Sequence, residues 1–472
     1  MPQNFIGADR DQLMLMPVDV REWLSEDDVA WQVLDVVDQL DLSGFYRRYR
    51  ANGQGAAAFD PALMLSLVIY AHAVGVRSSR AIERACTRDA GFKVVAGQRV
   101  PDHSTITRFL QRHREEVADV FGQVLRLCHA AGMARVGVIA VDGTKIAANA
   151  SWAKSYTAKA LAHQVAEQEA AYRQLAAELL DQHAATDAAE DAEHGERRGD
   201  EPPAALRGRA ARLKALRAAQ ADLQARQDRV RQEMLQRQKA RQDAYDARAA
   251  AGERGLGPRP ADEVKVGQPP SRQGGPPRAS VTDPDSRRMK AKHGFVQGYN
   301  AQIAVTDTQV ICGLLVTQTA TDHHLLPQVL TATRQALSDA GIDDPLRIVL
   351  ADAGYANEDT FTAAERDGLA LLAPVISDER RGLGADPLGG KDVSRLPATA
   401  RAQERLRSPD GEHHYAMRGR TVEPVFGQLK DRLGMRQFTR RGLTAVNAEF
   451  ALAATVHNIR KLITWNAATL TA

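Results

Sequence analysis

Two short apolar runs, far apart in the chain, each lead into an aspartate. The first run, RVGVIAV, precedes Asp142, and the second, LRIVLA, precedes Asp352. Runs of β-branched and aliphatic residues of this length predict buried strands. We therefore expect two strands that each end in an aspartate. Such an aspartate either caps the turn or helix that follows, or it places a carboxylate where a metal ion can bind.

The segments around these two runs predict an α/β fold. GYNAQIAVTD and QVICGLLVTQT predict a β-hairpin across the TDTQ turn, and LALLAPV predicts one more strand. Helices are predicted over HHLLPQVLTATRQALSDAG, over NEDTFTAAERDG and over the closing segment TAVNAEFALAATVHNIRKLITW, whereas residues 377–412 have a loop-rich composition. A hairpin followed by strand–helix crossovers predicts a mixed sheet flanked by helices.

Residues 1–134 have helical periodicity and predict an all-α N-terminal domain. Asp60 is a predicted N-cap with Pro61 at the first helical position, and PDHSTITRFLQRHREEVADVFGQVLRLCHAAG reads as one helix. Several short helices carry arginines, among them Arg108 and Arg112. They form either a helix-turn-helix-like DNA-binding unit or a plain bundle with a solvated basic face.

Residues 157–286 interrupt the strand pattern and read as an insertion. Two stretches with heptad-spaced apolar residues predict an antiparallel helical hairpin, which a Pro/Gly-rich tail without predicted regular structure follows. The second stretch is basic, with twelve Lys/Arg against five Asp/Glu between Ala205 and Arg248. This arm either contacts DNA or is an ordinary solvated coiled coil. The insertion divides the α/β domain into residues 135–156 and residues 287–472.

Composition narrows the class of protein. No apolar stretch approaches the length of a membrane span, and the N-terminus has no secretory signal pattern, so we expect no membrane and a cytoplasmic location. Three scattered cysteines are typical of a reducing compartment and exclude a disulfide framework or a cysteine zinc site. No P-loop and no dinucleotide-binding glycine pattern is present, so neither ATP nor NAD is implied.

A third carboxylate, Glu423, lies on a late helix in a basic segment. If the first and fourth predicted strands are neighbours, as in a ribonuclease-H-like sheet, Asp142 and Asp352 emerge side by side. Glu423 could then complete an oxygen-ligand site for Mg²⁺. The alternative is three unrelated capping or surface acids.

Several motifs resemble those of bacterial insertion-sequence DDE transposases. They are VDGTKIAANAS, GYNAQIAV, DAGYAN and YAMRGRTVEPVFGQLKDRLGMRQFTRRG, with VPDHSTITRFLQRH resembling the end of the accompanying N-terminal domain. The resemblance covers most of residues 10–150 and 283–465. It implies a ribonuclease-H-like core in which Asp142, Asp352 and Glu423 are both catalytic and metal-binding, with two ions of Mg²⁺ or Mn²⁺ as the expected cofactor.

The resemblance also implies the reaction and the partners. Such enzymes bind terminal inverted repeats, cut the DNA and join its ends to target DNA by metal-dependent hydrolysis and transesterification. We therefore expect DNA as the partner, at least a homodimer on DNA, and association with the bacterial nucleoid. The alternatives are an inactive or domesticated DNA-binding protein of the same fold, or a nuclease without strand transfer.

The C-terminal motif is the most specific part of the resemblance. The family signature is Tyr, two residues, Arg, three residues, Glu, six residues, Lys. Tyr415, Arg418, Glu423 and Lys430 match it, except that four residues separate Arg418 from Glu423. It therefore stays open whether Arg418 or Arg420 has the family role.

Basic residues near the predicted site are candidates for DNA contact, although they could also form a solvated rim. The candidate DNA-binding residues are Arg108, Arg112, Lys145, Lys292, Tyr415, Arg418, Arg420, Lys430, Arg440 and Arg441. The TDHH segment resembles an acid/base or metal cluster, but Thr321 or Asp322 is more readily explained as the cap of the next helix, with His323 as a secondary DNA contact.

Overall fold

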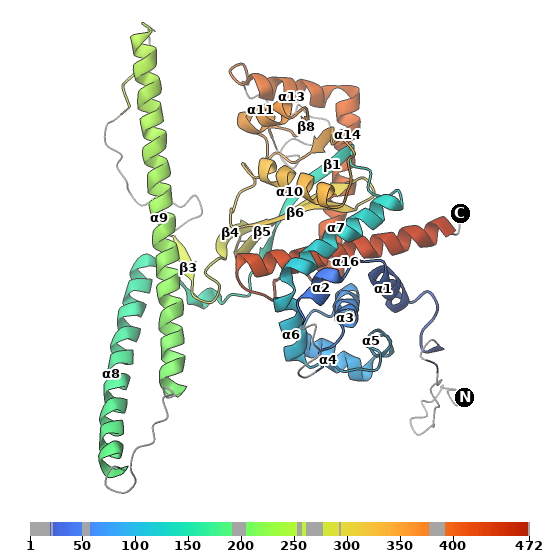
Figure 1. The fold of residues 1–472 in the computed structure, drawn as a ribbon. Coiled ribbons are helices and arrows are strands. Elements are labelled where there is room, and N and C mark those ends of the chain that lie inside the picture. Colours follow the sequence, from blue (N-terminus) through green and yellow to red (C-terminus); the bar gives the residue numbers. More distant parts are fainter. Residues whose placement is uncertain are drawn as a thin grey trace, which may run out of the picture.

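The computed structural model describes residues 19, 22–49, 57–190, 204–252, 257–260, 277–291, 294–376 and 392–470. Figure 1 shows a mixed sheet in the middle, helices around it, and a long two-helix arm to one side. The prediction of an α/β fold with a mixed sheet is confirmed. No helix in the described part of the chain is long and apolar enough to cross a membrane.

Within the described residues the sheet has six strands. Their backbone hydrogen bonds follow the order β4-β5-β1-β7-β8, with β6 also paired to β5. β1 (Val138–Ala147) is antiparallel to β5 (Gly294–Thr306) and parallel to β7 (Ile348–Leu350), and β8 (Ala370–Leu372) is parallel to β7. β6 (Ile311–Thr317) and β4 (Arg287–Ala291) both pair antiparallel with β5. The predicted hairpin is β5–β6, whereas β4 was not predicted.

β1 extends beyond Asp142, which corrects the sequence prediction that the first strand ends there. The strand continues to Ala147 because β5 pairs with it as far as the Ala147–Gly298 pair. Its parallel partner β7 is much shorter and ends at Leu350. A polar sequence such as DGTK could not show that a long antiparallel neighbour would keep it in a strand.

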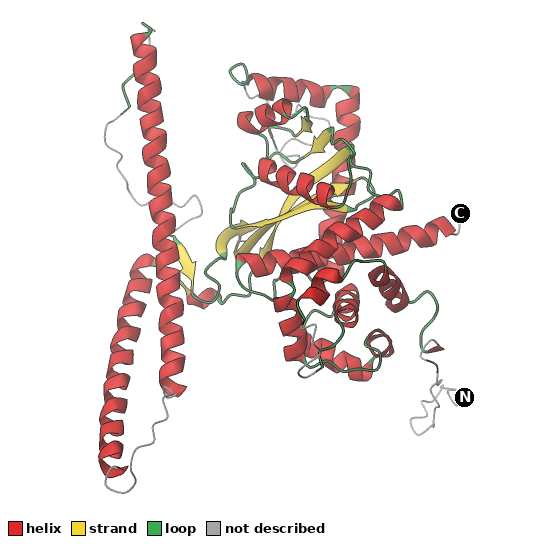
Figure 2. Cartoon of the chain, viewed as in Figure 1, coloured by secondary structure: helices red, strands yellow, loops and turns green. Residues whose placement is uncertain are grey.

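Two helices, α10 (Leu326–Asp339) and α16 (Leu443–Leu470), pack on the sheet, and a third, α7 (Arg114–Ala130), packs against both of them. Figure 2 shows the strands lying among these helices. Asn458 of α16 hydrogen-bonds the backbone N–H and C=O of Ile311, and Asn447 accepts the N–H of Val316. These amides satisfy backbone groups that the edge strand β6 would otherwise leave unpaired.

The N-terminal helices pack beneath the sheet layer and share one continuous core with it. They are α1 (Val29–Asp38), α2 (Ser43–Arg47), α3 (Pro61–Ala73), α4 (Ser79–Arg88), α5 (Ala90–Val95) and α6 (His103–Arg112). Asp60 caps α3 through the N–H of Ala62, as predicted. The single helix predicted across residues 101–132 is instead two, because the helix breaks at His113, whose buried ring packs against Phe45 and Phe109.

A second group of helices begins beside β8 and runs back to β1. It consists of α11 (Glu358–Arg366), α13 (Pro397–Arg407), α14 (Pro409–Thr421), α15 (Glu423–Gly427) and the π-helical turn η3 (Gln428–Arg432). The prediction of a loop across residues 377–412 is therefore wrong from Pro397 onward. Pro397 and Pro409 each begin a helix, a position where proline fits because its missing N–H would have no intrahelical partner.

The arm is a pair of helices with its own small core. α8 (Ala158–Glu190) packs against the first part of α9 (Ala204–Ala250), with Leu161 and Val165 buried against Leu213, Leu216 and Leu223. At its base, β2 (Ser155–Thr157) pairs with β3 (Arg278–Ser280), so the two ends of the arm meet. Figure 1 shows α9 continuing past this base, away from α8. Most of the predicted Pro/Gly-rich tail lies outside the described residues.

Candidate active site

Asp142 and Asp352 lie at the same level of two neighbouring strands. The last Cα pair of the parallel β1–β7 ladder is Ala140 with Leu350. Asp142 and Asp352 each follow their member of that pair by two residues. The short strand β7 ends just before Asp352, and so the two carboxylates lie close to each other at the edge where β7 stops. The predicted neighbourhood of these aspartates is thus present, although Asp142 is within its strand.

Burial makes both aspartates difficult to ionise. Burial raises the pKa of Asp142 to about 6, and the nearby Asp352 adds to the rise, although the Arg418 guanidinium opposes it. Burial likewise raises the pKa of Asp352, again against the effect of Arg418. Each carboxylate accepts one local backbone N–H, from Gly143 at 2.7 Å and from Gly354 at 2.9 Å. These bonds fix the orientation of the oxygens but leave much of the negative charge uncompensated.

Glu423 reaches this site across an arginine. The Arg418 guanidinium lies 3.4 Å from Asp142 Oδ2 and 3.5 Å from Glu423 Oε1. A guanidinium group is a compact planar fork, so the two carboxylates lie within roughly 10 Å of each other. Arg418 is buried, with its Nε unpartnered among the described residues, whereas the Glu423 side chain is 61% exposed. Glu423 therefore stands at the mouth of the site.

The extra residue between Arg418 and Glu423 falls at the junction of two helices. α14 ends at Thr421 and α15 begins at Glu423, but Val422 between them keeps its helical bonds: its N–H donates to the Arg418 carbonyl and its own carbonyl accepts the N–H of Phe426. Pro424 has no N–H, and the carbonyl of Arg420 instead accepts a hydrogen bond from Gln309 Nε2 at 2.9 Å. The Arg420 side chain is exposed, whereas that of Arg418 faces the aspartates. The geometry thus distinguishes two arginines that the spacing could not.

Lys430 approaches the same face of β1 as Asp142. It lies in the π-helical turn and donates to the Thr144 hydroxyl. Side chains two residues apart on a strand share a face, which places Lys430 beside Asp142. Burial lowers the pKa of Lys430, with Arg436 adding to that effect and Asp142 opposing it. Turns of this kind are frequent at functional sites, and here the turn carries a cation to the carboxylates.

Asp322 is a further carboxylate that the sequence analysis did not place here. It does not cap α10, whose N-cap is Leu325 without a side-chain bond. Its carboxylate instead accepts bonds from Asn300 at 2.7 Å, from Gln302 at 2.8 Å and from Lys145 at 3.2 Å. The assignment of Thr321 or Asp322 as a helix cap is therefore wrong. The signal that could have revealed it is the pair of polar residues, Asn300 and Gln302, within an otherwise apolar strand.

Tyr355 connects this polar network to the aspartate loop. Its hydroxyl donates to Gln302 Oε1, and its ring is fully buried. Gln302 in turn donates to Asp322, so one chain of bonds runs from the loop after β7, through β5, to Asp322 and Lys145. Fully bonded buried networks are rigid because an unmade bond in a dry interior is costly. The network holds the loop that carries Asp352.

The donor set fits a hard divalent cation. Asp142, Asp352 and Glu423 offer carboxylate oxygens, the ligands that Mg²⁺ prefers, and the two buried aspartates repel each other. The carboxylate oxygens of Asp142, Asp352 and Glu423 do not all lie within 4.8 Å of one another. Among the described residues, Glu83, Asp102 and His103 are the only group of three whose ligand atoms lie within 4.8 Å of one another. Arg418 lies between Asp142 and Glu423 and contacts both carboxylates.

The remaining candidates lie in three places. Tyr415 is partly buried on α14, one turn before Arg418. Arg108 and Arg112 are exposed on α6, where Arg112 stacks over the Tyr49 ring at 4.6 Å.

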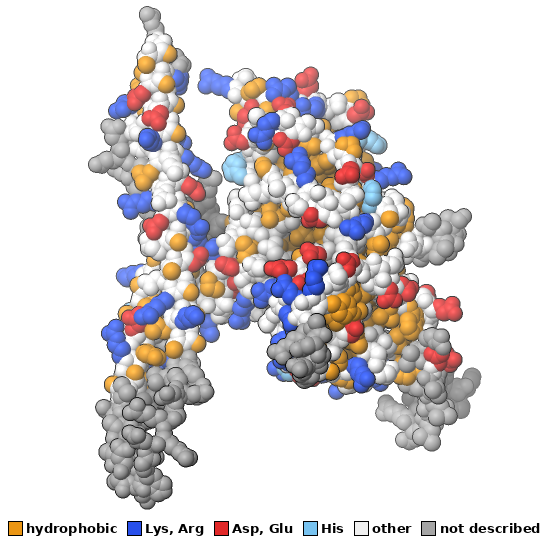
Figure 3. Space-filling view, viewed as in Figure 1, with side chains coloured by type: hydrophobic (Ala, Val, Ile, Leu, Met, Phe, Trp, Pro, Cys, Tyr) orange, Lys and Arg blue, Asp and Glu red, His pale blue; other side chains and the backbone are white. Residues whose placement is uncertain are grey.

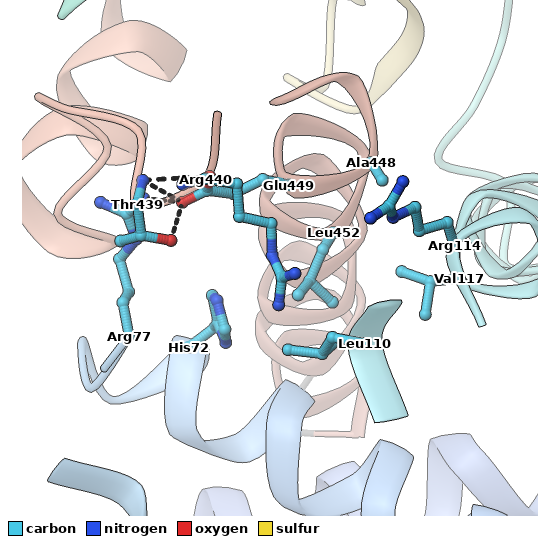
Figure 4. A pocket seen from close by; sticks show the side chains of 10 residues that line it. All are labelled: His72, Arg77, Leu110, Arg114, Val117, Thr439, Arg440, Ala448, Glu449 and Leu452. Carbon is cyan, nitrogen blue, oxygen red and sulfur yellow. Dashed lines mark hydrogen bonds and ion pairs between the residues drawn. The ribbon is translucent and has the colours of Figure 1, made fainter. Parts of the chain in front are cut away.

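Arg440 and Arg441 follow the segment that pairs beside the end of β1. Arg441 donates to the backbone O of Asn149. Arg440 instead points into a pocket that it lines together with His72, Arg114 and Glu449 (Figure 4). Lys292 lies outside the described residues.

Two family models match separate parts of the chain. A transposase domain (DUF772) matches residues 18–112, and a transposase DDE domain matches residues 392–463. The second match contains Tyr415, Arg418, Glu423 and Lys430, whereas Asp142 and Asp352 lie outside both. No curated protein and no solved structure gives a significant match to the chain.

Proposed function

The chain belongs to the insertion-sequence DDE transposases, and on this premise we propose that it binds the terminal inverted repeats of its element, cuts the DNA there and joins the ends to target DNA. The observation that carries the proposal is the placement of Asp142 and Asp352 at one level of neighbouring strands, with Glu423 across Arg418 from Asp142.

We further propose that the α/β body is a ribonuclease-H-like core. The strand order β6-β5-β1-β7-β8 supports this, because its first three strands are antiparallel and its last three are parallel. In such a core the central strand and its parallel neighbour each supply one carboxylate. The positions of Asp142 on β1 and of Asp352 after β7 agree with that arrangement.

Asp142, Asp352 and Glu423 are the proposed ligands of Mg²⁺ or Mn²⁺, and we propose that two ions bind there. Such an ion activates a water or a 3′-hydroxyl and stabilises the leaving oxygen of a phosphodiester. The chain prepares the site in two ways. Burial of the two aspartates strengthens their attraction to a cation, since charges interact more strongly away from water. The N–H groups of Gly143 and Gly354 orient one oxygen of each carboxylate.

Cations around the carboxylates are the proposed contacts for DNA phosphates. Arg418, Lys430 and Lys145 are the nearest, each already within reach of a site carboxylate or hydroxyl. Further proposed contacts are Tyr415, Arg420, Arg441, Lys292, Arg108 and Arg112. Joining two transposon ends requires both ends to be held together, so we propose at least a dimer on DNA.

The test is cleavage of a plasmid that carries the DNA flanking the gene, including both ends of the element. Asp142→Asn, Asp352→Asn and Glu423→Gln should each abolish cleavage in Mg²⁺. DNA binding should change little, because amides ligate metal poorly yet keep the shape of the side chain. Glu412→Gln, an exposed change on α14, is the matched control and should cleave normally.

The outcomes separate the alternatives. A variant at one of the three positions that cleaves like the unmodified protein removes that residue from the catalytic set. An unmodified protein that binds the ends but never cuts them is a DNA-binding relic. Cutting without joined products indicates a nuclease rather than a transposase.

A further inference from the structure

A small pocket lies where the N-terminal helices meet α16. Figure 4 shows its lining, which comes from four separate parts of the chain. His72 is on α3, Arg114 is the first residue of α7, Arg440 precedes α16, and Glu449 is on α16 itself. The pocket is therefore formed only when the N-terminal helices dock on the body. Arg77 strengthens that contact by donating to the backbone O of Gln437 at 3.0 Å.

Glu449 is the acidic residue of the pocket lining, and its carboxylate oxygens already have partners. Glu449 is almost completely buried and forms an ion pair with Arg77. It also accepts the backbone N–H groups of Thr439 at 2.9 Å and of Arg440 at 3.0 Å, as the dashed lines in Figure 4 indicate. Arg77 and Glu449 thus neutralise each other. The remaining charged groups of the lining are Arg114 and Arg440, both positive.

Among the described residues, neither of these two arginine side chains has a hydrogen-bond or ion-pair partner. Within the described part of the chain, Arg440 bonds only through its backbone N–H, and Arg114 Nε is buried without an acceptor. Burial lowers the pKa of Arg440, Glu449 opposes the shift, and the nearby Arg114 lowers the pKa further. Burial also lowers the pKa of His72 to about 4, so this imidazole is neutral at pH 7. The pocket therefore carries two uncompensated positive charges.

The size of the pocket limits what could compensate them. Its volume is about 30 Å³, which corresponds to roughly two water-sized atoms. A base or a side chain is too large to enter, whereas the two non-bridging oxygens of a phosphodiester fit. Guanidinium groups are suited to such oxygens because their N–H groups match them in pairs.

We propose that Arg114 and Arg440 bind a backbone phosphate of the DNA substrate in this pocket. The inference rests on the proposed action on DNA, and it adds a site separate from the catalytic carboxylates. The backbone N–H of Phe438, two residues before Arg440, donates to the carbonyl of Ala147 at the end of β1 at 2.8 Å. Ala147 is five residues from Asp142, which is about 17 Å along the strand. At 3.4 Å per nucleotide, a duplex spans that distance in about five base pairs.

The proposed site has a consequence for the free protein. Two neighbouring cations without an anion repel each other, so removing one should relieve the free protein rather than harm it. A purely structural arginine at a domain contact would behave in the opposite way. With phosphate bound, the unmodified protein should instead be the more stable form, because the phosphate compensates both positive charges.

The experiment compares Arg440→Gln, Arg114→Gln and Arg440→Lys with the unmodified full-length protein. Arg366→Gln, an exposed change on α11, serves as the control. Affinity for a generic duplex oligonucleotide is measured across a salt series. For each glutamine variant we expect roughly tenfold weaker binding and a slope of log K against log salt that is shallower by about 0.9, the loss of one phosphate contact. Arg440→Lys keeps the charge and should keep the salt slope, whereas its affinity should fall partway, because an ammonium group cannot match two phosphate oxygens as a pair.

Melting temperatures give a second readout that does not depend on cleavage. In chloride, Arg440→Gln should melt about 1–3 °C above the unmodified protein, and inorganic phosphate at equal ionic strength should stabilise the unmodified protein more than the variant. An unchanged salt slope in both glutamine variants overturns the proposal, whichever way the melting temperature moves. Cleavage by the carboxylate variants tests only the catalytic proposal, and the salt slope of the arginine variants tests only the phosphate site. Failure of the catalytic proposal is therefore distinguishable from failure of the phosphate-site proposal.

Discussion

At the scale of single residues, the candidate site carries a stability cost that its function would explain. Asp142 is held in a buried position where its pKa rises to about 6, mainly because of burial. In the unfolded chain the pKa returns to its ordinary value of about 3.9. Between these two values the folded state binds more protons than the unfolded state. The free energy of unfolding therefore falls as pH rises from about 4 to about 6.

This gives a prediction for Asp142→Asn in the presence of a chelator. Above pH 6 the variant should be more stable than the unmodified protein, by roughly 1–3 kcal/mol, since the buried charge is gone. Below pH 4 the difference should vanish, because Asp142 is then protonated and resembles asparagine. Urea unfolding at a series of pH values measures it. Added Mg²⁺ should stabilise the unmodified protein and leave the variant unaffected.

The contrary result is equally clear. If Asp142→Asn is less stable at every pH, the carboxylate is a structural partner of Arg418 rather than a strained ligand. Arg418 would then lose its buried partner and keep only the ion pair with the exposed Glu423, which is costly for a buried charge. The ion pair at 3.4 Å makes this a real alternative.

Individual roles were only partly predictable from the sequence. Asp142, Asp352 and Glu423 could be chosen because two follow strand-like runs and all three match family motifs. Asp322 was missed, because a Thr-Asp pair before a helix is typical of a cap. Its true partners, Asn300 and Gln302, lie about twenty residues earlier and come near only when β5 pairs with β6.

At the scale of elements, most strands and helices follow from periodicity, whereas their ends depend on neighbours. β7 and β8 lie where apolar runs predicted them. β1 continues through DGTK because β5 pairs with it. The single helix predicted across residues 101–132 breaks at His113, whose ring packs against Phe109 in the core. Local sequence contains no record of either partner.

The edge of β6 is the element whose stability depends most clearly on side chains. Asn458 is fully buried and supplies both a donor and an acceptor to the backbone of Ile311. Asn458→Ala should lower the free energy of unfolding by about 2–4 kcal/mol, because it leaves two buried backbone groups unpaired. Denaturant unfolding measures this, with an unchanged m-value as the sign that only stability has altered.

Asn447→Ala is the comparison for this prediction. Asn447 accepts only the N–H of Val316, in a partly buried position, so its loss should cost about 1 kcal/mol. Equal effects of the two substitutions would show that the amides act through packing on α16 rather than through the edge of the strand.

At the scale of the whole molecule, the arm is an appendage rather than part of the core. Its buried residues form a cluster separate from the one that unites the N-terminal helices with the sheet. The paired strands β2 and β3 bring its two ends together, with Thr157 opposite Arg278. Insertion between β1 and β5 therefore leaves their pairing intact. Heptad spacing predicted the helices, but not this two-stranded base.

Charge compensation along the arm argues against a strong grip on DNA. Arg217 pairs with Glu169 of α8, and Arg226 and Arg287 both pair with Asp222. Beyond the base, residues 226–248 contain seven Lys/Arg and four Asp/Glu, a net charge of +3. That charge is spread over about 33 Å of helix. Figure 3 shows basic and acidic side chains intermixed along this arm.

The last prediction follows from this geometry. Replacing residues 158–277 with Asn-Gly should join β2 to β3 as a tight hairpin, since opposed residues of antiparallel strands lie only about 5 Å apart. The body should keep its cooperative unfolding, and the salt slope of DNA binding should change by less than about 1, because few phosphate contacts are lost. A slope shallower by two or more would show that the arm holds several phosphates.

Analytical ultracentrifugation with DNA, before and after the replacement, tests the remaining use of an exposed heptad helix, which is contact with a second copy of the chain. Loss of the dimer on DNA in the shortened protein would assign the arm to protein contact, and an intact dimer would exclude it.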